Sequence, residues 1–235
     1  MQKSFTQVEK YFFDQQNVRD QQSRIPYITV KDFPSLGLLT SLRFLEWVYE
    51  NPEGVVSLPT GKTPEYFIKW TKLFTSNWDD SKFKKIRNNH GLKEKIKPDF
   101  SNLTFVQIDE FFPINSKQHN SFYNYVNKYY LENFSFSKEK ALLINCDNIS
   151  LYDGMSAKEI FLKKPIDLTL RYREPSSIIE EKQQKSIFLI DQWCSDYDQK
   201  IKDIGGIGFF LGGIGPDGHI AFNIRGSDHN STTRL

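Results

Sequence analysis

The sequence is poor in several features that would each define a class of protein. Its two cysteines among 235 residues are too few and too far apart for a recognisable disulfide framework, which favours a reducing compartment. No apolar run approaches the ~20 residues that are needed to span a bilayer. The N-terminus also shows no apolar signal core. The sequence therefore predicts a cytoplasmic protein without a membrane partner.

An excess of charge of either sign is equally missing. Lys plus Arg number 31 and Asp plus Glu number 29, which leaves a net charge of +2 and no basic stripe interleaved with aromatic residues. This composition gives no reason to expect a nucleic-acid partner. Metal-ligand spacing is not found among the four histidines, which are His90, His119, His219 and His229.

What the sequence does contain is an alternation of short apolar segments with longer amphipathic ones. Strands are expected at 54–58, 103–108, 141–144 and 209–211, and helices at 35–51, 65–76, 121–134 and 186–203. Such alternation predicts an α/β fold, a Rossmann-like three-layer sandwich with a mainly parallel sheet and helices on both faces. The aromatic stripe of the third helix (Phe122, Tyr125, Tyr129) is interpreted as core.

Two segments fall outside this pattern. Residues 1–34 are polar and Gln-rich with scattered aromatics, and we expect an N-terminal extension that packs onto one domain spanning 35–235. Residues 147–185 interrupt the alternation and are interpreted as an insertion that forms a lid or an interface.

The most informative segment runs from the strand at 209–211 into a glycine-rich turn. Gly213 and Gly215 let backbone amides approach a ligand closely, and Asp217 and His219 follow where open α/β sheets place their ligands. An Asp and a His two residues apart are a plausible acid–base pair. The alternative is a tight turn with a surface Asp and a capped His.

A second strand end carries Thr60, Gly61, Lys62 and Thr63 before a helix. The loop amides, the helix N-terminus and the threonine hydroxyls are suited to bind a phosphate, although the glycine spacing of a P-loop is absent. The alternative is an ordinary strand–turn–helix with a Thr cap.

A third strand ends in the adjacent carboxylates Asp109 and Glu110, followed by Phe111 and Phe112. A carboxylate that is partly desolvated beside aromatic rings has a raised pKa and can act as a general base. A surface strand end is the alternative.

Together and in this order, the segments SLPTGKTP (57–64), QIDEFFP (107–113) and GGIGPDGHIAFN (212–223) resemble the glucosamine-6-phosphate deaminase/isomerase family, which is related to the 6-phosphogluconolactonases. HNSFY (119–123) and STTR (231–234) are supporting matches. The resemblance implies conversion of glucosamine 6-phosphate to fructose 6-phosphate and ammonia in amino-sugar catabolism and N-acetylglucosamine utilisation. It implies no metal and no organic cofactor, and it allows a homo-oligomer.

Roles for individual residues also follow from the resemblance. His219, assisted by Asp217, would open the sugar ring, and Asp109 would move a proton from C2 to C1 by general acid–base catalysis. The phosphate would lie near Thr60, Gly61, Lys62 and Thr63, and the glycine turn would border the sugar. Further candidates for the site are Glu110, His119 and Arg234.

Two departures from the family pattern leave alternatives open. The family carries a Glu five residues after the active-site His, where this chain has Ile224. The family fold also continues beyond the Thr-Arg pair, so its C-terminal part is expected to be missing here. A sugar-phosphate-binding homologue with little or no turnover and a 6-phosphogluconolactonase-like hydrolase therefore remain alternatives to an active deaminase.

Overall fold

The computed structural model describes residues 5–16, 25–161, 165–227 and 233–234. Its centre is a sheet of four short parallel strands in the order β3-β2-β1-β4. The strands are β1 (Val55–Ser57), β2 (Thr104–Val106), β3 (Ala141–Leu142) and β4 (Phe209–Phe210). Each lies inside the segment that the sequence predicts, and the parallel arrangement is confirmed.

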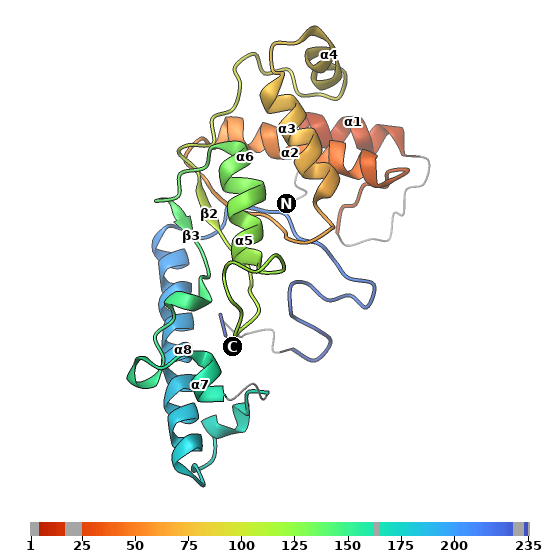
Figure 1. The fold of residues 1–235 in the computed structure, drawn as a ribbon. Coiled ribbons are helices and arrows are strands. Elements are labelled where there is room, and N and C mark those ends of the chain that lie inside the picture. Colours follow the sequence, from red (N-terminus) through yellow and green to blue (C-terminus); the bar gives the residue numbers. More distant parts are fainter. Residues whose placement is uncertain (1–4, 17–24, 162–164, 228–232, 235) are drawn as a thin grey trace.

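Helices cover both faces of this sheet, so the predicted three-layer α/β architecture is confirmed. Val56 and Phe105 face the main core, which they share with α2 (Phe33–Glu50) and α3 (Glu65–Ser76). Val55 and Val106 point to the opposite face, where they pack against α8. The alternation of side chains along a strand explains why adjacent valines enter different layers. Figure 1 shows these layers.

The remaining helices complete the layers. On the side of the main core, α1 (Gln7–Gln15) packs against α2 and contributes Val8 and Phe12 to that core. A further short helix is α4 (Ser81–Asn89). One continuous helix over 122–134 consists of α5 (Phe122–Val126), the π-helix η1 (Asn127–Leu131) and α6 (Glu132–Phe134).

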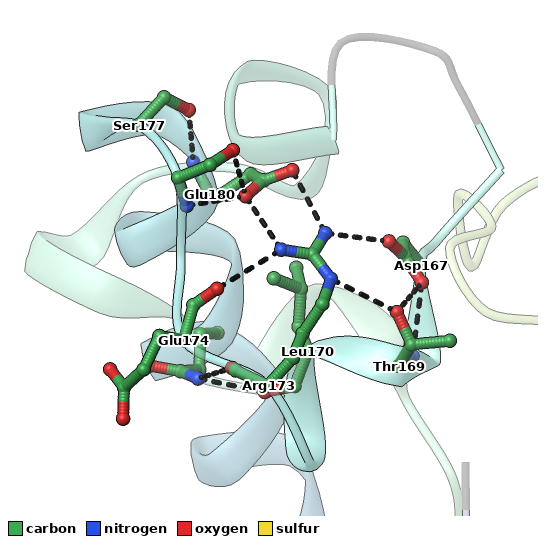
Figure 2. A network of polar contacts seen from close by, with 9 residues as sticks. Asp167, Thr169, Leu170, Arg173, Glu174, Ser177 and Glu180 are labelled. Carbon is green, nitrogen blue, oxygen red and sulfur yellow. Dashed lines mark hydrogen bonds and ion pairs between the residues drawn. The ribbon is translucent and has the colours of Figure 1, made fainter.

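The segment interpreted as an insertion folds against α8 (Ile178–Asp203) around a second apolar core. Its elements are η2 (Cys146–Asn148), η3 (Tyr152–Gly154), α7 (Ala157–Phe161) and η4 (Leu168–Arg171). Ion pairs join the two parts: Arg171 binds Asp191 of α8 through two hydrogen bonds, and Arg173 links Asp167 to Glu180 (Figure 2). The helix begins at Ile178 and not near residue 186 as predicted, because Ser177 caps it. Its first two turns therefore belong to the segment interpreted as an insertion, and there Gln183 donates a hydrogen bond to the carbonyl of Ile160.

The strand order places a topological switch point between β1 and β4. The chain moves outward from β1 through β2 to β3 and then returns to pair β4 with the other edge of β1. Open α/β sheets bind their ligands in the crevice outside the carboxyl ends of the strands at such a point. Among the described helices, none is long and apolar enough to cross a membrane.

Candidate active site

The three segments singled out in the sequence meet at the switch point. Residues that follow β1, β2 and β4 line one cavity of about 400 Å³, a volume within the usual range for small-molecule sites. The predicted site residues in its lining are Thr60, Thr63, Asp109, Gly213, Gly215 and His219. The fold therefore brings together side chains that are up to 159 positions apart in the sequence.

The loop between β1 and α3 forms one wall of this cavity. Gly61 adopts φ +80°, a left-handed conformation that glycine adopts at little cost. Within the described part of the chain, the amides of Thr60, Gly61, Lys62 and Thr63 donate no hydrogen bond to a protein acceptor. The Lys62 side chain is exposed and does not line the cavity.

The glycine-rich turn after β4 lies against this loop and against the histidine. A Cβ on Gly213 would lie 3.2 Å from Thr63 Cγ2, which is tighter than an ordinary contact. A Cβ on Gly215 would lie 2.1 Å from His219 Cε1, so the imidazole occupies the space that a side chain would need. A side chain at Gly213 would press on the loop, and one at Gly215 would displace the His219 ring from its place.

Asp217 holds the His219 ring in a defined orientation. The Asp217 carboxylate accepts a hydrogen bond from His219 Nδ1, and this bond lowers the pKa of Asp217. Since an ionised carboxylate can only accept, Nδ1 carries the proton in the neutral form of the ring, and the lone pair is then on Nε2. The pair therefore presents a basic nitrogen, as a group that transfers protons requires.

Asp109 is the titratable group in this cavity whose pKa is most clearly shifted. Burial, and secondarily the charge of Glu110, raise the pKa of Asp109 to about 6. Such a value suits a group that takes a proton and later returns it near neutral pH. The side chain of Gln107 fixes the backbone here, because it donates to the carbonyl of Asp109 and accepts from the amide of Ile144.

Glu110 has a different role from its neighbour. Its carboxylate accepts hydrogen bonds from Ser121 Oγ and from the amides of Phe122 and Tyr123, so it caps the N-terminus of α5. It also accepts from the amide of Phe111. Because these bonds occupy both oxygens, the structure assigns helix capping to Glu110 and leaves Asp109 as the carboxylate available for chemistry.

Replacing Glu110 with Gln is expected to lower the free energy of unfolding by about 1 kcal/mol, the usual value of a helix cap. The pKa of Asp109 should fall at the same time, because one of the charges that raises it is removed. Chemical denaturation measures the first effect, and NMR titration of the Asp109 carboxyl measures the second. Glu53→Gln, at an exposed carboxylate, is the matched control. Equal stability of Glu110→Gln and this control would contradict the capping role.

A second, larger cavity of about 1210 Å³ adjoins the first. The two share five lining residues: Ile108, Asp109, Ile220, Ala221 and Phe222. Beyond these, the larger cavity extends to α8, where Trp193 and Cys194 line it. Asp109 therefore lies at the junction of the two cavities, of which the larger has the more apolar lining.

The other candidates lie at the edge of the site or outside it. Arg234 lines the larger cavity and donates a hydrogen bond to Asn223. Ile224, which is 64% exposed, lines the same cavity. His119 is exposed and lines neither cavity. Ser231 and Thr232 of the last matching segment, and His229, lie outside the described residues.

Several residues near the site were not predicted from the sequence. Phe122 lines the small cavity, although the stripe to which it belongs was interpreted as core. Tyr125 and Tyr130 bind the loop after β1, and Gln107 fixes the backbone of Asp109. Within the described residues, no group of three or more His, Cys, Asp or Glu is arranged to hold a metal ion.

Known proteins similar to this chain include several deaminases. A glucosamine-6-phosphate deaminase from Borreliella burgdorferi (strain ZS7) is 28% identical over 186 residues, which cover 79% of this chain and 48% of that protein. The glucosamine-6-phosphate deaminase of Bacteroides fragilis (strain YCH46) is 60% identical over 45 residues, or 19% of this chain and 17% of that protein. No family model matches the chain.

Among solved structures, that of a monomeric glucosamine-6-phosphate deaminase superposes with a TM-score of 0.54 at 19% identity. The match covers 86% of this chain and 60% of that one, and it supports the fold. The chain spans about half the length of the curated relatives that it matches over most of its own sequence. These relatives confirm the resemblance to the glucosamine-6-phosphate deaminase family that the three segments indicate.

Proposed function

We propose that the chain carries the sugar-phosphate site of a glucosamine-6-phosphate deaminase. The observation that supports this most strongly is that Thr60, Asp109 and His219, from three separate segments, line one cavity at the switch point of the sheet. The names of the relatives indicate the substrate. The pathway that follows from it is amino-sugar catabolism.

Each part of the site has a place in the reaction. The free amides of residues 60–63 and the threonine hydroxyls bind the phosphate. His219 Nε2 transfers the proton that opens the pyranose ring. Asp109 then removes the proton from C2 and returns one to C1, which converts the open-chain aldose amine into the imine of the ketose. Addition of water and loss of ammonia give fructose 6-phosphate.

Ile224 favours a second candidate function, a protein that binds the sugar phosphate with little turnover. The side chain is apolar where the family carries a Glu, so it can neither take up nor donate a proton. Ile224 lines the larger cavity and not the small cavity that His219 lines. Loss of this carboxylate weakens the proton relay but leaves the phosphate-binding loop intact.

Ammonia release from glucosamine 6-phosphate by the purified chain tests the proposal, with the longest native open reading frame measured beside it. Turnover that exceeds the uncatalysed rate by several orders of magnitude is expected if the site is complete. Binding without ammonia release from either form would contradict the deaminase and leave the binding protein. Hydrolysis of 6-phosphogluconolactone, measured in parallel, would instead identify a lactonase.

A further inference from the structure

The loop after β1 is held from behind by two tyrosine hydroxyls. Tyr125 Oη donates a hydrogen bond of 2.9 Å to the carbonyl oxygen of Gly61, and Tyr130 Oη donates one of 2.5 Å to that of Pro59. Tyr130 is fully buried and Tyr125 is half-buried. Pro59 and Thr60 line the small cavity, whereas neither tyrosine does, so the hydroxyls contact the loop from outside the cavity.

The π-helix η1 explains how both tyrosines reach one loop. They are five residues apart, and in a regular α-helix residues at this spacing point in different directions. Hydrogen bonds in a π-helix span five residues, so a π turn brings side chains five apart closer to one face than a regular α-helix does. Tyr130 lies inside the π segment and Tyr125 just before it. Their rings pack edge to face, with 6.1 Å between the ring centroids.

The two hydrogen bonds fix the direction of two peptide groups. In a planar trans peptide the carbonyl and the following amide N–H point in opposite directions. Drawing the carbonyls of Pro59 and Gly61 towards the helix therefore turns the amides of Thr60 and Lys62 the other way. Within the described part of the chain, neither amide donates to a protein acceptor.

We infer that Tyr125 and Tyr130 are positioning residues, which orient the amides of Thr60 and Lys62 towards the phosphate of the bound sugar. This inference rests on the proposed function, since it concerns the same site. The two hydrogen bonds also draw two carbonyl oxygens, the negative ends of their dipoles, away from the anion. Burial raises the pKa of Tyr125 to about 12, so its hydroxyl remains a donor at every pH at which the protein would be assayed.

The test compares Tyr125→Phe with Tyr129→Phe by calorimetric titration of inorganic phosphate, glucosamine 6-phosphate and glucosamine. The Tyr129 ring lies tilted against that of Tyr125, with 4.5 Å between the ring centroids, and its hydroxyl makes no hydrogen bond to the described residues. This control therefore removes the same atom from a neighbouring ring. Tyr125→Phe should weaken the binding of both phosphate-containing ligands about 3- to 10-fold, the usual effect of one lost hydrogen bond. Binding of glucosamine and the properties of Tyr129→Phe should not change.

In any form that turns over the substrate, Tyr125→Phe should raise KM and leave kcat unchanged, which loss of stability alone would not produce. Tyr130→Phe should act in the same direction but also lower the melting temperature, because it leaves the carbonyl of Pro59 without its buried donor.

Unchanged phosphate binding in Tyr125→Phe, with a wild type that binds, would overturn this inference alone. A wild type that binds neither phosphate compound would overturn it together with the proposed function. Phosphate binding that depends on Tyr125 in a chain without deaminase activity would support the inference and contradict only the proposed reaction.

Discussion

Replacing Asp109 with Asn is expected to reduce the turnover of glucosamine 6-phosphate by about 10²- to 10⁴-fold, the usual contribution of one general acid–base group. Asn keeps the shape of the side chain but cannot accept the proton from C2. The dissociation constant of the substrate should change little, because the phosphate loop is formed by other residues. Ammonia release measures the first effect and calorimetry the second.

The same substitution is expected to stabilise the protein above pH 6. The pKa of Asp109 is raised to about 6, above its ordinary value of 3.8 in the unfolded chain, so the folded state disfavours the charged form. Ionisation of Asp109 therefore lowers the free energy of unfolding. This loss of stability is absent below pH 3.8, grows as the pH rises from 3.8 to 6, and is complete above 6. It amounts to at most about 3 kcal/mol, and it does not occur with Asn, which carries no charge.

Denaturation of wild type and Asp109→Asn at pH 4 and pH 8 measures this effect. The difference in the free energy of unfolding should be small at pH 4 and clear at pH 8. In a form that turns over the substrate, kcat/KM, which reports the free enzyme, should fall as the pH drops through about 6, where Asp109 becomes protonated. Full activity of Asp109→Asn, or equal stability of the two proteins at both pH values, would contradict the role given to this carboxylate.

Replacing His219 with Gln is expected to lower turnover by a similar factor, about 10²- to 10⁴-fold, because the group that opens the ring is lost. Binding of the sugar phosphate should persist, since the loop at residues 60–63 is unchanged. Stability should also change little, because the ring is partly exposed and it donates its hydrogen bond to Asp217, which is also exposed. Steady-state kinetics and calorimetry on the purified variant test both expectations.

Asp217→Asn is the informative companion to that variant. It keeps a hydrogen-bonding group beside the ring but no longer fixes the proton on Nδ1, so turnover should fall less than in His219→Gln. A larger loss in Asp217→Asn than in His219→Gln would mean that Asp217, and not the imidazole, transfers the proton. Unchanged turnover in His219→Gln would exclude the histidine from the reaction.

The convergence of the candidate site residues could be predicted because they lie at strand ends. In a parallel sheet the carboxyl ends of the strands meet at one edge, so three short segments that each follow a strand are expected to converge. In the structure, Thr60, Asp109 and His219 do line one cavity, as this argument predicts. The three strand pairings are all parallel, as the sequence predicts.

The residues that the sequence did not reveal act through tertiary contacts. Asp109 and Glu110 look equivalent in the sequence, and only the packing of α5 shows that Glu110 is its cap. Tyr125 and Tyr130 read as parts of an amphipathic helix, because a π turn leaves no clear signature in a sequence. The start of α8 was predicted too late, because its first two turns lie in the segment interpreted as an insertion and the helix packs on that segment's apolar core.

The central claim is that one cavity, formed at the ends of β1, β2 and β4, binds the sugar phosphate. Titration of the isotopically labelled chain with glucosamine 6-phosphate, followed by amide NMR shifts, tests it most directly and does not depend on turnover. The predicted result is that the largest shifts fall on residues 60–63, on Asp109 and on residues 213–219. Shifts concentrated on α4 or along the outer face of α8, or no saturable shifts at all, would contradict the account.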